Sequence, residues 1–322
     1  MLLGGRLATR HQAALRYPCR LTTAVARRLT THEPARSTFV PSSVPRNSVK
    51  WGMGVLDRLG VSVHDESSSF EAMFGVHRSN SLYAHNVRAQ RILDMDLSSL
   101  EAVDEQIRVD RMSSSPDDIV VMLLKSLREV VYFPLSEKMH VDLVMYSLFV
   151  IAEFLTADID IILSPDVGFN VFMPVGSSQG TVGISAVTNL AIRRRSTLSI
   201  VVKSDEPGEG GDTDLPAQLF ASMAGAYFTN MINCDTDEQD MFGVSLVGTL
   251  PTIFKVHFTR QKFNALRRAL VCARDASAPL LEMRRYDLAT EQNALPTFAS
   301  DDKDHLRHVF QCLFALRQSI DT

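Results

Sequence analysis

The chain has 322 residues, of which 45% are hydrophobic and 22% charged, and its formal net charge is −4 at pH 7. This length suffices for one large domain or two small ones, and the composition is that of an ordinary globular protein. No tract is of low complexity, and no segment reaches about 18 apolar residues without a charge, so we expect no transmembrane segment.

Residues 1–32 have the composition of a mitochondrial transit peptide. They contain six arginines, the first acidic residue is Glu33, and the interleaved leucines and alanines would give a helix an apolar face. A disordered basic tail is the alternative. Without this segment 27 basic residues stand against 37 acidic ones, so the mature chain lacks an overall basic footprint for nucleic acid. We predict a protein of the mitochondrial matrix.

The next segments divide the chain further. Residues 33–50 are rich in proline and serine and are predicted to be a linker. Residues 51–112 form an N-terminal extension, with short helices expected at 67–74 and 97–112. We assign residues 113–274 to the core, where the periodic pattern sharpens.

The core begins with two helices. Ser113 to Asp118 supplies cap candidates, a proline and two acids, which together mark a helix start, and apolar residues follow at helical spacing. Pro134 ends that helix, and a more apolar one is expected from residue 137 to residue 156.

The period then changes to that of strands. Strands are predicted at 159–163, 169–175, 182–192, 197–203, 242–247 and 252–258, and helices from 214 to about 227 and at 261–274. Residues 275–322 are predicted to be a loop-rich segment, to residue 303, followed by an amphipathic helix. This order predicts an α/β (α+β) protein with a mixed central β-sheet flanked by helices, and helical N- and C-terminal extensions.

The pattern at 181–218 resembles a known family. Two apolar strands end in Lys203, and an acidic, glycine-rich loop leads to a helix that carries Gln218. Over residues 137–260 the chain is similar to the core of the PD-(D/E)XK nuclease-like superfamily, which implies a restriction-endonuclease-like fold. In that family one strand presents an Asp, the next a Glu-x-Lys, and the following helix often a Gln. The carboxylates bind Mg²⁺, which activates water, and the lysine positions or deprotonates the nucleophile.

Carried over residue by residue, the resemblance implies a degenerate site. Lys203 matches the lysine and Gln218 the glutamine, whereas the Asp position falls on Asn189 and the Glu position on Val201. Neither Asn189 nor Val201 is a carboxylate, so no catalysis and no metal are predicted. The plainer interpretation is that Lys203 marks where a strand meets solvent and Gln218 is a surface or capping residue.

A second register restores one carboxylate. Asp166 follows Pro165 as a literal Pro-Asp pair, and Asp158 and Asp160 precede it, although they also suit a solvent-facing edge. The Glu position stays at Val201 unless an acid of the next loop replaces it. The candidates are Asp205, Glu206 and Glu209.

Other residue types add little chemistry. Cysteines are few and widely spaced, at positions 19, 234, 272 and 312, which gives no zinc motif and no disulfide framework. His305 and His308 share a helix face that we expect to be hydrophilic. No cofactor-binding motif occurs. Basic residues that would either be solvated or contact RNA or a partner are Arg193, Arg194, Arg195, Lys255, Arg260 and Lys262.

Three functions follow as hypotheses. The first is a non-catalytic structural subunit of a mitochondrial ribonucleoprotein, such as the mitoribosome or an RNA-processing complex, with other protein subunits and RNA as partners. The second is an active Mg²⁺-dependent nuclease with migrated carboxylates. The third is an accessory subunit of a respiratory or ATP-synthase complex, in which the apolar helix at 137–156 would face a membrane subunit.

Overall fold

The computed structural model describes residues 45, 47–132, 138–154, 161–175, 180–194, 196–205, 214–247, 250–271, 279–288 and 303–320. The predicted transit peptide and most of the predicted linker lie outside these residues. The same holds for Cys272, Asp158, Asp160, Arg195, Glu206 and Glu209.

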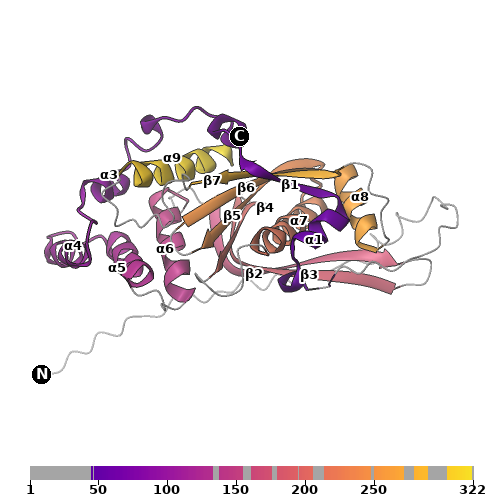
Figure 1. The fold of residues 1–322 in the computed structure, drawn as a ribbon, viewed down its shortest axis with the longest axis horizontal. Coiled ribbons are helices and arrows are strands. Elements are labelled where there is room, and N and C mark those ends of the chain that lie inside the picture. Colours follow the sequence, from indigo (N-terminus) through magenta and orange to yellow (C-terminus); the bar gives the residue numbers. More distant parts are fainter. Residues whose placement is uncertain are drawn as a thin grey trace, which may run out of the picture. The chain divides into compact units, whose positions relative to one another are not determined.

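Seven strands in the described part of the chain form one mixed sheet, in the order β1-β7-β6-β5-β4-β3-β2 (Figure 1). β4 and β5 are parallel, as are β1 and β7, and the other neighbours are antiparallel. The strands are β1 (Val61–Ser67), β2 (Ile161–Val175), β3 (Gly180–Arg194), β4 (Thr197–Asp205), β5 (Glu238–Val247), β6 (Leu250–Thr259) and β7 (Leu281–Asp287). The predicted α/β class, with a mixed central sheet flanked by helices, is confirmed.

Helices cover both faces of the sheet, and each face has its own hydrophobic core (Figure 1). One core contains α1 (Met53–Leu59), α7 (Leu215–Asn233) and α8 (Arg260–Val271). The other contains α2 (Phe70–Phe74), α3 (Val87–Asp94), α4 (Leu100–Met112), α5 (Asp118–Tyr132), α6 (Lys138–Ile151) and α9 (Lys303–Ser319).

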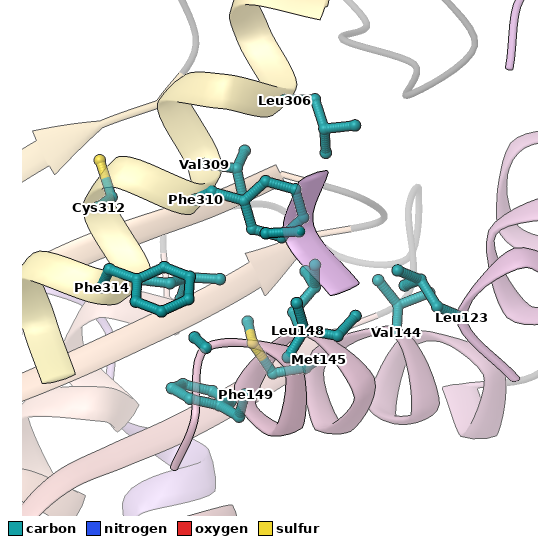
Figure 2. Close-up of a cluster of buried hydrophobic side chains, with 14 of the residues drawn as sticks. Leu123, Val144, Met145, Leu148, Phe149, Leu306, Val309, Phe310, Cys312 and Phe314 are labelled. Atoms are coloured by element: carbon teal, nitrogen blue, oxygen red, sulfur yellow. The ribbon is translucent and has the colours of Figure 1, made fainter. Parts of the chain in front are cut away.

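The apolar helix α6 lies inside the second core. Figure 2 shows side chains of α6, among them Val144 and Leu148, and side chains of α9, among them Val309 and Phe310, converging in one cluster. These four residues are fully buried within the chain, so this face of α6 is not available to a partner. Among the described residues, no helix combines the length and hydropathy needed to cross a bilayer.

Helix α7 connects the parallel strands β4 and β5, which require a crossover rather than a hairpin. It is buried over almost its whole length, and the side chain of its Asn230 forms hydrogen bonds with the backbone of β4. The Asn230 Oδ1 atom accepts from the Leu198 N–H at 2.8 Å, and its Nδ2 donates to the Leu198 carbonyl at 2.6 Å. The side-chain amide thus satisfies both backbone groups of Leu198, which precedes the β4–β5 ladder.

Three details differ from the sequence-based prediction. The strands expected at 159–163 and 169–175 are one strand, β2, and its two prolines (Pro165 and Pro174) are accommodated because β2 is an edge strand. β1 was not predicted at all. The segment 275–303 was predicted to be loop-rich, which is wrong for β7, since that strand pairs with both β6 and β1.

The start of α5 also differs in detail. The residue that caps it is Asp117, whose Oδ1 accepts from the Ile119 and Val120 N–H groups, rather than one of the preceding serines. The Arg88 Nε atom of α3 donates to the other oxygen at 2.7 Å. Burial raises the pKa of Asp117, but this contact and the helix N–H groups outweigh it and lower the pKa overall.

Candidate functional site

Lys203 and Gln218 contact each other where β4 ends and α7 begins. Lys203 is the seventh residue of β4, and Gln218 lies in the first turns of α7. The Lys203 Nζ atom donates to the Gln218 Oε1 atom at 2.6 Å. The two residues that the family resemblance matched are therefore brought together, and neither is an isolated surface residue.

The other two matched positions lie beside this pair but carry no charge. Val201 shares a strand face with Lys203, because side chains two apart on a strand point the same way. It is fully buried in the core on the α7 side of the sheet. Asn189 precedes Leu190, which pairs with Val202, so Asn189 and Lys203 lie one step beyond that pair on neighbouring strands.

In the second register, the two residues that would form the site, Asp166 and Lys203, do not lie on adjacent strands. Asp166 belongs to β2 and Lys203 to β4, and β3 lies between them. The side chains of Asp166 and Asp205 are outside the described part of the structure. Within the described residues, no cluster of three or more His, Cys, Asp or Glu side chains is arranged to hold a metal ion.

The predicted basic contacts fall into two groups. Arg193 and Lys262 are exposed, whereas Arg194 is half-buried and its Nη1 atom donates to the Ile320 carbonyl at 3.1 Å.

The second group is paired with acids. The Lys255 Nζ atom lies 2.8 Å from the Asp240 Oδ2 atom. Arg260 pairs with Asp235 at 2.6 Å and with Asp237 at 2.8 Å. These two cations are thus partly neutralised within the chain, which leaves Arg193 and Lys262 as the more accessible predicted contacts for RNA.

A hollow of about 670 Å³ was missed by the sequence analysis. It lies where β3 ends, β4 and β5 begin, and α9 ends, and its charged lining residues are Arg194, Glu238, Asp240 and His257. Hydroxyl side chains complete much of the wall, among them Thr197 and Ser199 of β4. Its residues come from distant segments, so no local motif marks it.

Asp240 is the electrostatic centre of this hollow. It pairs across the strands with His257, whose Nδ1 atom lies 2.8 Å from the Asp240 Oδ1 atom, while Lys255 holds the other oxygen. Burial raises the pKa of Asp240, but the hydrogen bonds from Lys255 and His257 outweigh it and lower the pKa overall. The charge of the Asp240 carboxylate is therefore compensated by Lys255 and His257 on β6, which also fix its orientation.

A third polar cluster joins α9 to β7. The Tyr286 hydroxyl lies 3.0 Å from the His308 Nε2 atom, and the Cys312 thiol 3.9 Å from the same nitrogen. The prediction that His308 lies on a hydrophilic face is therefore wrong, because its ring packs against Tyr286 and Phe70. Burial, with a smaller contribution from Arg78, lowers the pKa of His308 to about 4. Cys312 is a buried free thiol, and burial raises its pKa.

The depressed pKa of His308 predicts a loss of stability in acid. The unfolded chain binds a proton at this histidine near pH 6.5 and the folded chain only near pH 4, so stability is fully present above pH 6.5 and declines as the pH falls towards 4. We expect the decline to be on the order of 2 kcal/mol, measured by urea unfolding at a series of pH values.

A His308→Gln variant retains an acceptor for Tyr286 but cannot titrate. Its unfolding free energy should change less steeply over this pH window than that of the unaltered chain. His85→Gln, at an exposed histidine, is the matched control and should keep the original slope. Equal slopes for both variants would contradict the assignment to His308.

No family model matches this sequence, and no curated protein is significantly similar to it.

Proposed function

We propose that this chain is a non-catalytic structural subunit of a mitochondrial ribonucleoprotein, built on a restriction-endonuclease-like core that has lost its metal ligands. The observation that carries the proposal is the Lys203–Gln218 contact beside a buried valine. In the resemblance, Lys203 and Gln218 match a nuclease lysine and glutamine, and in the structure the lysine donates to this neutral amide at 2.6 Å.

The surroundings of Val201 support the loss of metal binding. Its side chain is 0% exposed and lies among apolar residues of α7 and the sheet. A carboxylate at this position would be buried without water, at a high desolvation cost, unless a cation compensated for it. Reversal of this one residue would also leave Asn189 at the Asp position, so it would not rebuild the site.

The order of elements also supports the nuclease-like ancestry. α6 precedes three antiparallel strands (β2, β3 and β4), and α7 then crosses to β5, which lies parallel to β4. This is the helix, strand and helix order over which the sequence resembles the family. The ancestry is what suggests RNA, and the arginine-rich sequence at 1–32 is what suggests the mitochondrion.

The catalytic part of the proposal is tested by a cleavage assay on the full chain. We expect no cleavage of single-stranded RNA or DNA in 10 mM Mg²⁺ or Mn²⁺ above the rate seen with the Lys203→Ala variant, because the two carboxylate positions are Asn189 and Val201. Metal-dependent cleavage that disappears in Lys203→Ala would instead establish an active nuclease with migrated carboxylates.

The assembly part is tested by sedimentation of a mitochondrial matrix extract with and without RNase. The chain is expected to migrate with a large particle and to shift to lower mass after RNase treatment. Migration near the mass of a single chain, which is at most 35.8 kDa, in both samples would refute the assembly. Migration with a large particle that RNase leaves intact would favour the third hypothesis, a subunit of a respiratory or ATP-synthase complex.

A further inference from the structure

The hollow beside α9 combines chemical groups that the proposed function does not use. Glu238 and Asp240 are two residues apart on β5, so their side chains share one face of the sheet, and their Cα atoms are about 7 Å apart along the strand. Arg194, at the end of β3, is on the same wall and is held in place by the Ile320 carbonyl. The volume of about 670 Å³ lies within the range of small-molecule sites.

These groups restrict the kind of ligand. An inorganic anion would approach the carboxylate of Glu238 as a like charge, and a simple cation would approach Arg194 as a like charge. Carboxylates accept hydrogen bonds, whereas a guanidinium carries five N–H donors and can serve a carbonyl and a phosphate together. A suitable ligand therefore carries hydroxyl donors and an anionic group on one small framework.

We propose that this hollow binds a ribonucleoside monophosphate group, with its 2′,3′-diol on Glu238 and Asp240 and its phosphate on Arg194. Asp240 is fixed by Lys255 and His257, so it accepts from a hydroxyl in a set orientation. Glu238, which is exposed at the start of β5, supplies the second acceptor. The hydroxyl groups of Thr197 and Ser199 provide further polar contacts on the wall.

Such a group has two sources, a free mononucleotide and the 3′-terminal residue of an RNA, because both present a vicinal diol beside a phosphate. The proposal does not depend on assembly into a ribonucleoprotein. Failure of the sedimentation experiment would leave this site intact, and failure of nucleotide binding would leave the assembly intact.

The test is isothermal titration of the full chain with uridine 5′-monophosphate and with its 2′-deoxy analogue. We expect the ribonucleotide to bind about tenfold more tightly, because the analogue leaves a charged acceptor without its hydroxyl donor. Uridine, which lacks the phosphate proposed to contact Arg194, is also expected to bind more weakly than uridine 5′-monophosphate. Equal affinity for the two nucleotides, or no binding of either at millimolar concentration, would overturn the proposal.

Variants connect the binding to the hollow. Glu238→Gln is expected to weaken binding of the ribonucleotide about tenfold and to reduce its preference over the deoxynucleotide. Glu282→Gln, at an exposed glutamate of β7 outside the hollow, should bind like the unaltered chain. Thermal unfolding of both variants shows whether they are folded, and unchanged binding by a folded Glu238→Gln chain would contradict the site.

Fluorescence anisotropy with a 5′-labelled decauridylate distinguishes the two sources, a free mononucleotide and an RNA 3′ end. One version ends in a ribose diol and the other in a 2′,3′-dideoxyribose. Binding that requires the diol assigns the site to an RNA 3′ end, whereas binding of the mononucleotide without either oligomer assigns it to a free nucleotide. Equal binding of both oligomers, with no preference for the ribo form of the mononucleotide, would contradict the site.

Discussion

Replacement of Arg91 by methionine is expected to lower the free energy of unfolding by about 3–5 kcal/mol, because it leaves a buried carboxylate without its cation. Asp110 is 1% exposed and lies in the last turn of α4, and its Oδ1 atom pairs with Arg91 of α3. Its Oδ2 atom accepts from the backbone N–H of Asp117 at 3.2 Å. The methionine keeps the apolar stem but no charge, and urea unfolding at pH 7 measures the loss.

Two further variants isolate the buried charge as the cause. Arg108→Met removes an arginine from an exposed i,i+3 pair with Glu105 and should cost less than about 1 kcal/mol. Adding Asp110→Asn to Arg91→Met removes the uncompensated charge, so the double variant should be more stable than Arg91→Met alone. A double variant that is no more stable would show that packing, rather than charge, causes the loss.

The elements of the core were largely predictable from the sequence. The apolar spacing of α5 and α6 and the β-branched runs of β3 and β4 have strong periods, and the structure places these elements within a few residues of the prediction. β7 was not predictable in this way. Its sequence, LEMRRYD, is mostly charged and is no better suited to a strand than to a helix. It is a strand because it pairs with β6 and β1, partners far from it in sequence.

The same reason explains the error at His308. A helical pattern shows which residues share a face, but it does not show what covers that face. The covering residue is Tyr286, which belongs to β7, so missing the strand also meant missing the partner. The family resemblance singled out Lys203 and Gln218 separately, and their contact is a finding of the structure. The hollow around Asp240 could not be anticipated, because three strands that are separate in the sequence (β3, β5 and β6) supply its charged residues.

Replacement of Gly225 by alanine is expected to destabilise the fold by about 2–3 kcal/mol, although alanine is the better helix former. Gly225 lies within α7, and a Cβ atom there would be 2.4 Å from the Cβ atom of Phe169 on β2. A Cβ atom cannot rotate away, so α7 and β2 would have to separate, and the apolar contacts between them would weaken.

Gly54→Ala is the matched control, because α1 has open space at that position and the change should stabilise by about 0.5–1 kcal/mol. Thermal and urea unfolding of both variants measures the difference. If alanine stabilises the chain at both positions, there is room for a Cβ atom at residue 225, and the predicted clash with Phe169 is wrong.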